Sequence, residues 1–292
     1  HRVRDAGVAG SNPATPTIPF FPAAKACPRA VRRIVDKLPA LGSPPHMTPS
    51  LRTLLIAAGV ACVLAAPAAE AAHPGRRPPA AIGYSRDAQR VLVQARAAAG
   101  GAGWNYLRGW HETGRVGGRP YESWFDPLRY GMRIETREPA GLHVHGYNGL
   151  GEWEILPDGQ VHGGDGLPTV AEARTTAFLT VYGFFYPGRF DARGGYLGVR
   201  QADGRAFDVV EVKPYGGKAR ELWFDRRTHL LGRIVDRSGP RPVTVSLSDY
   251  RRVGPVQVAM RFTVEGAPVQ DRQVESLTFQ PADRDRFGLP RP

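Results

Sequence analysis

The sequence has little cysteine. Its 292 residues include two, Cys27 and Cys62, and both lie in the first quarter of the chain. Residues 73–292 therefore contain no thiol, which excludes disulfide bonds, cysteine-ligated metals and cysteine nucleophiles from this part. A secreted domain of this size can depend on its hydrophobic core instead.

Catalytic signatures are missing as well. The sequence has no Gly-x-Ser-x-Gly elbow, no His-Glu-x-x-His, no phosphate-binding loop and no Gly-x-Gly-x-x-Gly. It also lacks the Asp-Thr-Gly or Asp-Ser-Gly loop with which an aspartic protease presents its carboxylate. The nearest string, Asp236-Arg237-Ser238-Gly239, has the wrong spacing. We therefore expect a noncatalytic protein that needs no cofactor and no metal.

Lysine is scarce too, since Lys213 and Lys218 are the only lysines in residues 73–292. The whole chain has a net charge of +12, and this part has 31 basic against 24 acidic residues. Its arginines alternate with Asp and Glu and do not form a basic stripe with aromatic platforms, so we expect no nucleic-acid partner. Association with anionic lipid surfaces is expected to be transient at most.

A secretory signal is predicted over residues 47–72. Met47 and one arginine precede an apolar run from Thr53 to Ala66, and a small-residue cleavage region ends at Ala72. Cleavage near Ala71 or Ala72 would place the protein in the periplasm or outside the cell. A retained membrane anchor is the main alternative, but the apolar run is shorter than the roughly 20 residues that span a bilayer. Lipid attachment at Cys62 is a weaker alternative.

The rest of the chain divides by composition. Residues 1–46 are expected to be an upstream extension of the reading frame or a disordered leader. Residues 73–84 are Pro-rich and predict a linker, residues 85–287 predict one β-rich domain, and residues 288–292 form a tail.

Two helices are predicted in that domain. Ser85 caps the first, whose apolar residues recur at helical spacing and which ends at Gly100-Gly101. Thr169 and Glu172 form a capping box before the second, which is expected to end near Pro187. Its apolar stripe consists of Ala177, Phe178, Val181, Tyr182 and Phe185.

The other segments predict strands. About five fit between Trp104 and Leu156, and six or seven fit between Tyr196 and Gln280, with Gly, Pro or Asp turn signals between them. Strands and helices do not alternate regularly, which argues against a parallel sheet. The sequence therefore predicts an α+β fold that is mainly β, with a curved antiparallel sheet around one or two helices.

A local repeat marks both halves of the domain, because Glu122-Ser123-Trp124-Phe125-Asp126 is matched by Glu221-Leu222-Trp223-Phe224-Asp225. In a strand, the Glu, Trp and Asp share one face and the Phe lies on the other. Trp124 and Trp223 could line an apolar ligand cleft, or they could be packing residues of similar hairpins.

Several of these segments together resemble a known family. The quoted strings are Gly146-Tyr147-Asn148-Gly149 with Trp153, Phe207-Asp208-Val209-Val210, Glu221–Asp225 with Leu230-Leu231, and Ser248-Asp249-Tyr250-Arg251. Over roughly residues 85–287, the chain resembles the LolA/LolB-like superfamily of periplasmic lipoprotein carriers. More closely, it is similar to the LolA-like N-terminal domain of bacterial retropepsin-type aspartyl protease family proteins. Five residues follow Phe287, so we expect the protease domain to be missing.

The resemblance implies a half-open antiparallel sheet with helices plugging its concave side and an apolar cavity between them. The expected function is binding of a lipid, a lipoprotein acyl chain or a hydrophobic peptide. The candidate ligand-binding residues are Trp124, Phe178, Tyr182, Phe185 and Trp223. The alternative is a structural or protein-interaction module whose cleft is filled by its own side chains, with a partner that the sequence does not identify.

A third, weaker alternative is a metal-dependent hydrolase. His143-Val144-His145 places two imidazoles on one face of a predicted strand, with His162 and Glu152 or Asp165 nearby in the sequence. A zinc site would need a third ligand that converges on these two.

Overall fold

The protein is represented by a computed structural model that describes residues 83–164, 167–266 and 271–289. All of these belong to one of the two compact units of the chain. The predicted leader, the predicted signal peptide and most of the predicted linker lie outside the described residues. Gly83 and Tyr84, predicted as the end of the linker, form strand β1.

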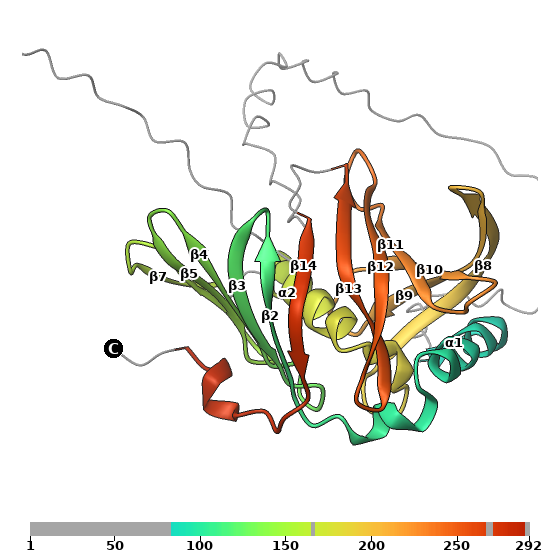
Figure 1. Ribbon diagram of the computed structural model, residues 1–292, viewed down its shortest axis with the longest axis horizontal. Helices are drawn as coiled ribbons and strands as arrows, with labels where there is room; N and C mark the ends of the chain where they lie inside the picture. The colour runs from blue at the N-terminus through green and yellow to red at the C-terminus, as the bar shows by residue number, and fades with distance from the viewer. Residues whose placement is uncertain (1–82, 165–166, 267–270, 290–292) are drawn as a thin grey trace, which may run out of the picture. The chain divides into compact units, whose positions relative to one another are not determined.

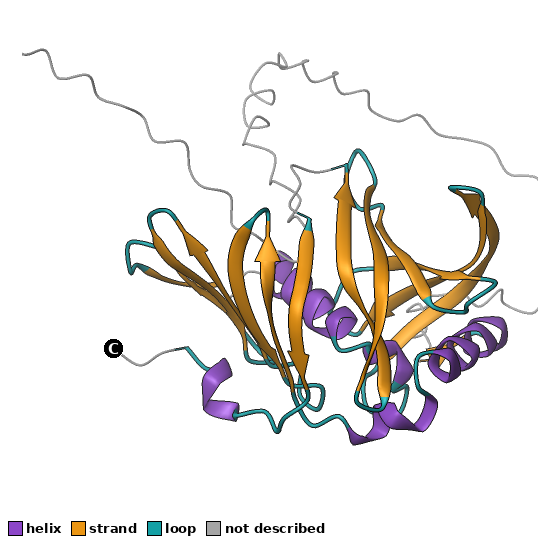
Figure 2. Cartoon of the chain, viewed as in Figure 1, coloured by secondary structure: helices purple, strands orange, loops and turns teal. Residues whose placement is uncertain are grey.

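Strands dominate the described part of the chain (Figure 2). They form one 14-stranded sheet in the order β1-β8-β9-β10-β11-β12-β13-β14-β2-β3-β4-β5-β6-β7. The β1–β8 pair is parallel and the other described pairs are antiparallel. The strand bounds are β1 Gly83–Tyr84, β2 Trp110–Val116, β3 Arg119–Phe125, β4 Met132–Glu138, β5 Gly141–Tyr147, β6 Glu152–Ile155, β7 Val161–Gly164, β8 Ala192–Ala202, β9 Arg205–Pro214, β10 Arg220–Asp225, β11 Leu231–Asp236, β12 Val243–Val253, β13 Val256–Glu265 and β14 Arg272–Thr278.

Figure 1 shows the sheet curving around α2. The helical elements are α1 Arg86–Ala98, η1 Gly101–Tyr106, α2 Leu167–Thr180, η2 Gly183–Phe185 and η3 Arg284–Phe287. No helix in the described ranges combines the length and hydropathy needed to cross a membrane. The predicted class is confirmed: the fold is mainly β, and a curved, open antiparallel sheet is covered by helices.

The predicted strand groups are also confirmed. Five strands lie between Trp110 and Ile155, and seven between Ala192 and Thr278. Asp side chains make the turns that the sequence signalled, because Asp126 Oδ1 accepts from the backbone N–H of Leu128 and Asp225 Oδ1 from that of Arg227. One boundary was wrong, since Trp104 lies in η1 and not in a strand.

Helix α1 forms as its sequence predicts. The Ser85 hydroxyl accepts from the N–H of Ala88, 3.3 Å away, and satisfies one of the free donors of the first turn. The buried residues Ala88, Val91, Leu92 and Ala95 recur at helical spacing. They hold α1 against β8 and β9.

Helix α2 differs from its prediction at both ends. It begins at Leu167, so Thr169 lies inside the helix and the predicted capping box was wrong. It ends at Thr180, because Tyr182 adopts the left-handed conformation with φ 53° and η2 follows. The missed signal was Gly183, since a Cβ there would lie 2.4 Å from the Phe178 ring. The predicted apolar stripe is nevertheless buried throughout.

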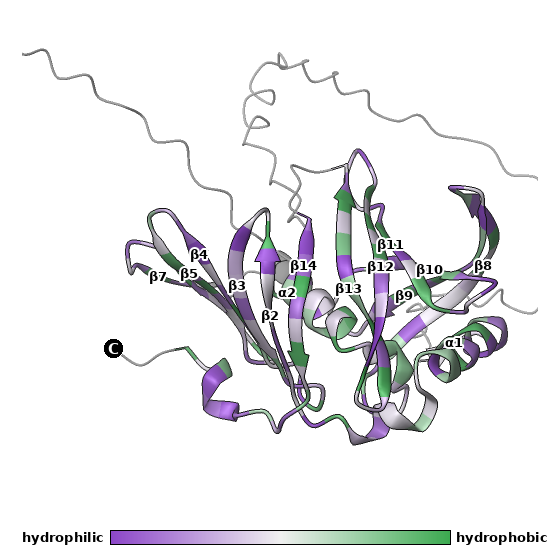
Figure 3. Cartoon of the chain, viewed as in Figure 1, coloured by the Kyte–Doolittle hydropathy of each residue, from purple (hydrophilic) through white to green (hydrophobic). Residues whose placement is uncertain are grey.

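Alternation along the strands separates two faces of the sheet (Figure 3). The inner face and the helices form the main hydrophobic core, which contains Leu222 and Phe224 of β10. Trp223 lies between these two residues and belongs to a small cluster on the outer face, with Phe207, Val209 and Val235.

Candidate functional site

The inner face of the sheet is the candidate site, and the α2–η2 segment covers it. We call residues 167–185 the plug. Its buried aromatic side chains are Phe178, Tyr182, Phe184 and Phe185. Trp104 lies 4.8 Å from the Tyr182 ring and 5.2 Å from the Phe185 ring, and Trp110 stacks on Tyr182 at 6.3 Å. These contacts are offset or tilted, as aromatic pairs prefer.

The predicted ligand residues of the plug therefore fill the inner face themselves. Phe178 is fully buried, and its ring lies 6.1–6.3 Å from those of Tyr130, Phe184 and Phe190. Burial raises the pKa of Tyr182 to about 12, so its hydroxyl is neutral at all physiological pH values. In this structure the second half of the plug is held to the sheet by aromatic packing.

A charged network holds the first half of α2. The Glu172 carboxylate accepts from Arg220 at 2.6 Å and pairs with Lys218 at 3.0 Å. Arg220 is 1% exposed, and its Nη2 also lies 2.9 Å from Asp236 Oδ2. Glu172, read from the sequence as a capping residue, is thus the anchor of the plug to β10 and β11.

Arg174 makes a second anchor. It donates to the Tyr147 hydroxyl at 2.7 Å, to the carbonyl of Gly149 at 2.9 Å and to the carbonyl of Tyr215 at 3.2 Å. One guanidinium therefore joins the turn after β5 to the turn after β9. The two anchors are polar and directional, whereas the aromatic side chains between Phe178 and Phe185 make apolar contacts.

The inner face near Trp110 also carries a buried charge pair. Glu112 is 2% exposed and accepts from Trp110, from the Tyr121 hydroxyl and from Arg272 at 2.5–3.1 Å. Arg272 lies over the Phe262 ring at 3.7 Å. These contacts satisfy both charges inside the sheet.

Towards β7 the inner face becomes polar. We call its His and Glu side chains on β4 to β7 the polar wing: Glu138, His143, His145, Glu152, Glu154 and His162. The strand register places them on the face of Met132, Ile134 and Tyr147, which belong to the main core.

Within the polar wing, each buried imidazole meets a carboxylate. His143 Nε2 lies 3.3 Å from Glu154 and its Nδ1 3.6 Å from Glu138. His145 Nε2 lies 2.5 Å from Glu152. The bond to Glu154 raises the pKa of His143, and the same bond lowers the pKa of Glu154.

The two histidines share one face, as predicted, but no third ligand converges on them among the described residues. In residues 83–164, 167–266 and 271–289, no three His, Cys, Asp or Glu side chains are placed to hold a metal ion. Asp165, a candidate third ligand, lies outside the described residues. The wing instead consists of imidazole–carboxylate pairs.

Trp223 lies away from the plug, on the outer face. Its indole N–H donates to Glu221 at 3.0 Å, and Arg200 lies over its ring at 5.6 Å. Its neighbour Phe207 is fully buried in the same outer cluster. The structure thus separates Trp223 from Phe178, Tyr182 and Phe185.

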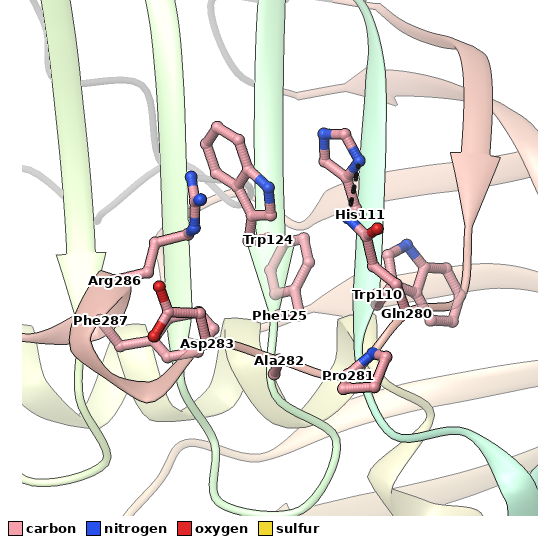
Figure 4. Close-up of a pocket in the computed structure, with 10 residues that line it drawn as sticks. All are labelled: Trp110, His111, Trp124, Phe125, Gln280, Pro281, Ala282, Asp283, Arg286 and Phe287. Carbon is pink, nitrogen blue, oxygen red and sulfur yellow. Dashed lines mark hydrogen bonds between the residues drawn. The ribbon is translucent and has the colours of Figure 1, made fainter.

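Trp124 is on the outer face too, stacked on His111 at 5.2 Å with Arg286 at 4.3 Å above the ring. It lines a cavity of about 60 Å³ between β2, β3 and the C-terminal segment, shown in Figure 4. This space suits a few water molecules and is too small for an acyl chain. The repeated Glu-x-Trp-Phe-Asp string therefore encodes similar hairpins.

Sequence reasoning missed Trp104, Trp110, Arg174 and Arg220. Trp104 and Trp110 lie in a segment that the sequence predicts as strand. No local pattern distinguishes a tryptophan in the core from one that contacts a ligand. The arginines lie 46 positions apart, and only the curvature of the sheet brings their partners to α2.

Together, the curved open sheet and the aromatic plug define a half-barrel protein of the α+β class, with an apolar inner face and a polar wing. No protein-family model matches the chain, and no curated protein sequence matches it.

The chain is similar to several solved structures. The chain is similar to an outer membrane lipoprotein-sorting protein domain from Vibrio parahaemolyticus, with 14% identity and a TM-score of 0.46, covering 68% of this chain and 97% of that one. A DUF1329 family protein from Desulfovibrio piger is 14% identical with a TM-score of 0.46, and the match covers 69% of this chain and 97% of that one. LprF from Mycobacterium bovis is 11% identical with a TM-score of 0.24, and the match covers 68% of this chain and 98% of that one.

Proposed function

We propose that the protein binds an apolar chain, such as a lipid or lipoprotein acyl chain, on the inner face of its sheet. The observation that supports this proposal is the division of the plug into a polar, anchored half and an apolar half. The aromatic side chains between Phe178 and Phe185 pack on the inner face without hydrogen bonds between their rings. An acyl chain could take their place on that face and bury a similar apolar surface.

The end of α2 provides a place where the plug can bend. Tyr182 has a positive φ, which is rare for a residue with a side chain, and Gly183 follows it. Movement there would release Tyr182 and Phe185 from Trp104 while Glu172 and Arg174 keep their partners. The proposed location is the periplasm, which follows from the predicted signal peptide.

A second candidate is a protein-interaction module with a self-filled inner face. The complete burial of the plug aromatics favours it, because a permanent core would have the same packing. In that case the plug would stay closed and no acyl chain would bind. The two candidates therefore differ in ligand binding and in the effect of loosening the plug.

A pair of matched variants separates them. Phe178 lies in the plug and Phe207 in the outer cluster, and both are 0% exposed. Replacing either by Leu should lower the free energy of unfolding by about 1–2 kcal/mol. Phe178→Leu also destabilises the closed plug relative to the open state, so the affinity for an acyl chain should rise by up to about tenfold. Phe207→Leu should leave the affinity unchanged.

Native mass spectrometry with lipid extraction and titration with dodecanoate measure these effects. A copurifying lipid, and tighter binding to Phe178→Leu alone, would support the carrier. If wild type and both variants have clean apo masses and do not bind dodecanoate or dodecylamine, the carrier proposal is wrong and the interaction module is favoured.

A further inference from the structure

The C-terminal segment closes a small cavity against the outer face of the sheet (Figure 4). We call residues 279–288 the strap. Hydrogen bonds hold its backbone at two points, since the N–H of Ala282 donates to the carbonyl of Arg108 at 3.3 Å and the indole N–H of Trp153 donates to the carbonyl of Phe287 at 2.9 Å. The Phe287 side chain is buried as well. The strap is therefore part of the fold, and the cavity of about 60 Å³ beneath it is built into the protein.

Three planar side chains that line this cavity stand side by side. Trp124 of β3 lies opposite His111 of β2, and their rings stack at 5.2 Å with an interplanar angle of 6°. The guanidinium of Arg286, from the strap, lies 4.3 Å from the centre of the Trp124 ring. Figure 4 shows Trp124 between the other two. The ring already has a cation and an aromatic neighbour, which disfavours a further cation or a further ring as the ligand.

Arg286 brings an unpaired positive charge to the cavity. It is half-buried, and within the described ranges no carboxylate lies at ion-pairing distance from its guanidinium. The indole N–H of Trp124 likewise has no acceptor in this part of the chain. His111 differs, because its Nε2 lies 2.8 Å from a Glu122 oxygen. A guanidinium without a carboxylate favours an anionic ligand, and its planar fork of N–H groups suits a carboxylate.

The volume limits the ligand to a few atoms. One water needs about 10–15 Å³ of such space, so a cavity of about 60 Å³ takes roughly four to six non-hydrogen atoms. Acetate and propionate fall in this range. Phe125, Ala282 and Phe287 also line the cavity, and their apolar surfaces suit the short alkyl part of such an acid.

We propose that the cavity under the strap binds a small carboxylate, with Arg286 as its charge partner. The carboxylate can belong to a free short-chain acid or to the end of a peptide chain, because both present the same group. The site is separate from the proposed acyl-chain site, since the strap lies on the outer face and the plug covers the inner face.

Acetate and acetamide test the charge requirement, because the two molecules have nearly the same shape and differ in charge. We expect acetate to bind wild type with a Kd of about 1–10 mM and acetamide to bind at least about tenfold more weakly. NMR of the Trp124 indole N–H follows both titrations. Arg286→Gln should remove the difference between the ligands. The matched control is Arg284→Gln, which removes an exposed arginine of the same short helix that does not line the cavity.

Asp283→Asn should give a gain that a purely structural role would not. Asp283 lines the cavity, and its Oδ1 accepts from the N–H of Asp285 at 3.1 Å. Asparagine can accept the same bond, so the urea midpoint should not change. Removal of the negative charge should tighten acetate binding by about threefold and leave acetamide binding unchanged. An unchanged ratio of the two affinities would contradict the assignment.

The outcomes decide the site and then its ligand. If the Trp124 signal of wild type does not shift with acetate, if acetamide binds equally well, or if Arg284→Gln weakens acetate binding as much as Arg286→Gln does, the site is overturned. If the site stands, N-acetylglycine identifies the source of the carboxylate. Binding as tight as that of acetate would support a chain terminus as the ligand, and binding at least about tenfold weaker would support a free acid.

Discussion

The anchor of the plug can be measured through the Glu172–Arg220 pair. Arg220 is 1% exposed and its guanidinium meets two carboxylates, those of Glu172 and Asp236. Removing one partner of a buried ion pair costs about 3–5 kcal/mol, because the other charge stays buried. Glu172→Gln leaves Arg220 with Asp236, so we expect about 3 kcal/mol. Arg220→Met leaves two carboxylates, so we expect at least about 4 kcal/mol.

Urea unfolding followed by tryptophan fluorescence provides the assay, with the double variant completing a cycle. Trp104 and Trp110 report on the inner face, since both are buried against the plug. The sum of the two single losses should exceed the loss in the double variant by about 1–3 kcal/mol, because each single change removes the same Glu172–Arg220 interaction. Additive losses would refute the reasoning and show that Glu172 and Arg220 do not depend on each other.

Two further predictions concern the polar wing and its edge. The raised pKa of His143 adds stability that is complete below its ordinary value of 6.5 and is lost as the pH rises through the folded value. Glu154, lowered from 4.5, adds stability that is lost as the pH falls through its folded value. The contribution of this pair to stability should therefore be greatest near pH 5–6, which thermal unfolding across pH measures. His143→Gln should reduce the loss of stability above that range. An unchanged loss in this variant would contradict the prediction. Gly146→Ala would place a Cβ 2.1 Å from the Trp153 ring and should cost about 1–3 kcal/mol in urea unfolding. Gly163→Ala is the control, since its Cβ would meet no atom within 4 Å, and equal losses would contradict the explanation.

The sequence alone determined the fold class and much of its detail. Local rules are sufficient for α1, because the Ser85 cap and the spacing of Val91, Leu92 and Ala95 act within a few residues. The same holds for the turns at Asp126 and Asp225, whose side chains bond the backbone two residues on. Strand alternation also predicted that Trp223 and Phe224 lie on opposite faces.

Only the tertiary structure decided which face of each strand lies towards the core and which partner each buried charge has. It placed Trp124 and Trp223 on the outer face, although both had been candidates for the cleft. It also turned Glu172 from a capping residue into the partner of Arg220, 48 positions away. Such contacts depend on the curvature of the whole sheet and on burial, and neither is contained in a local stretch of sequence.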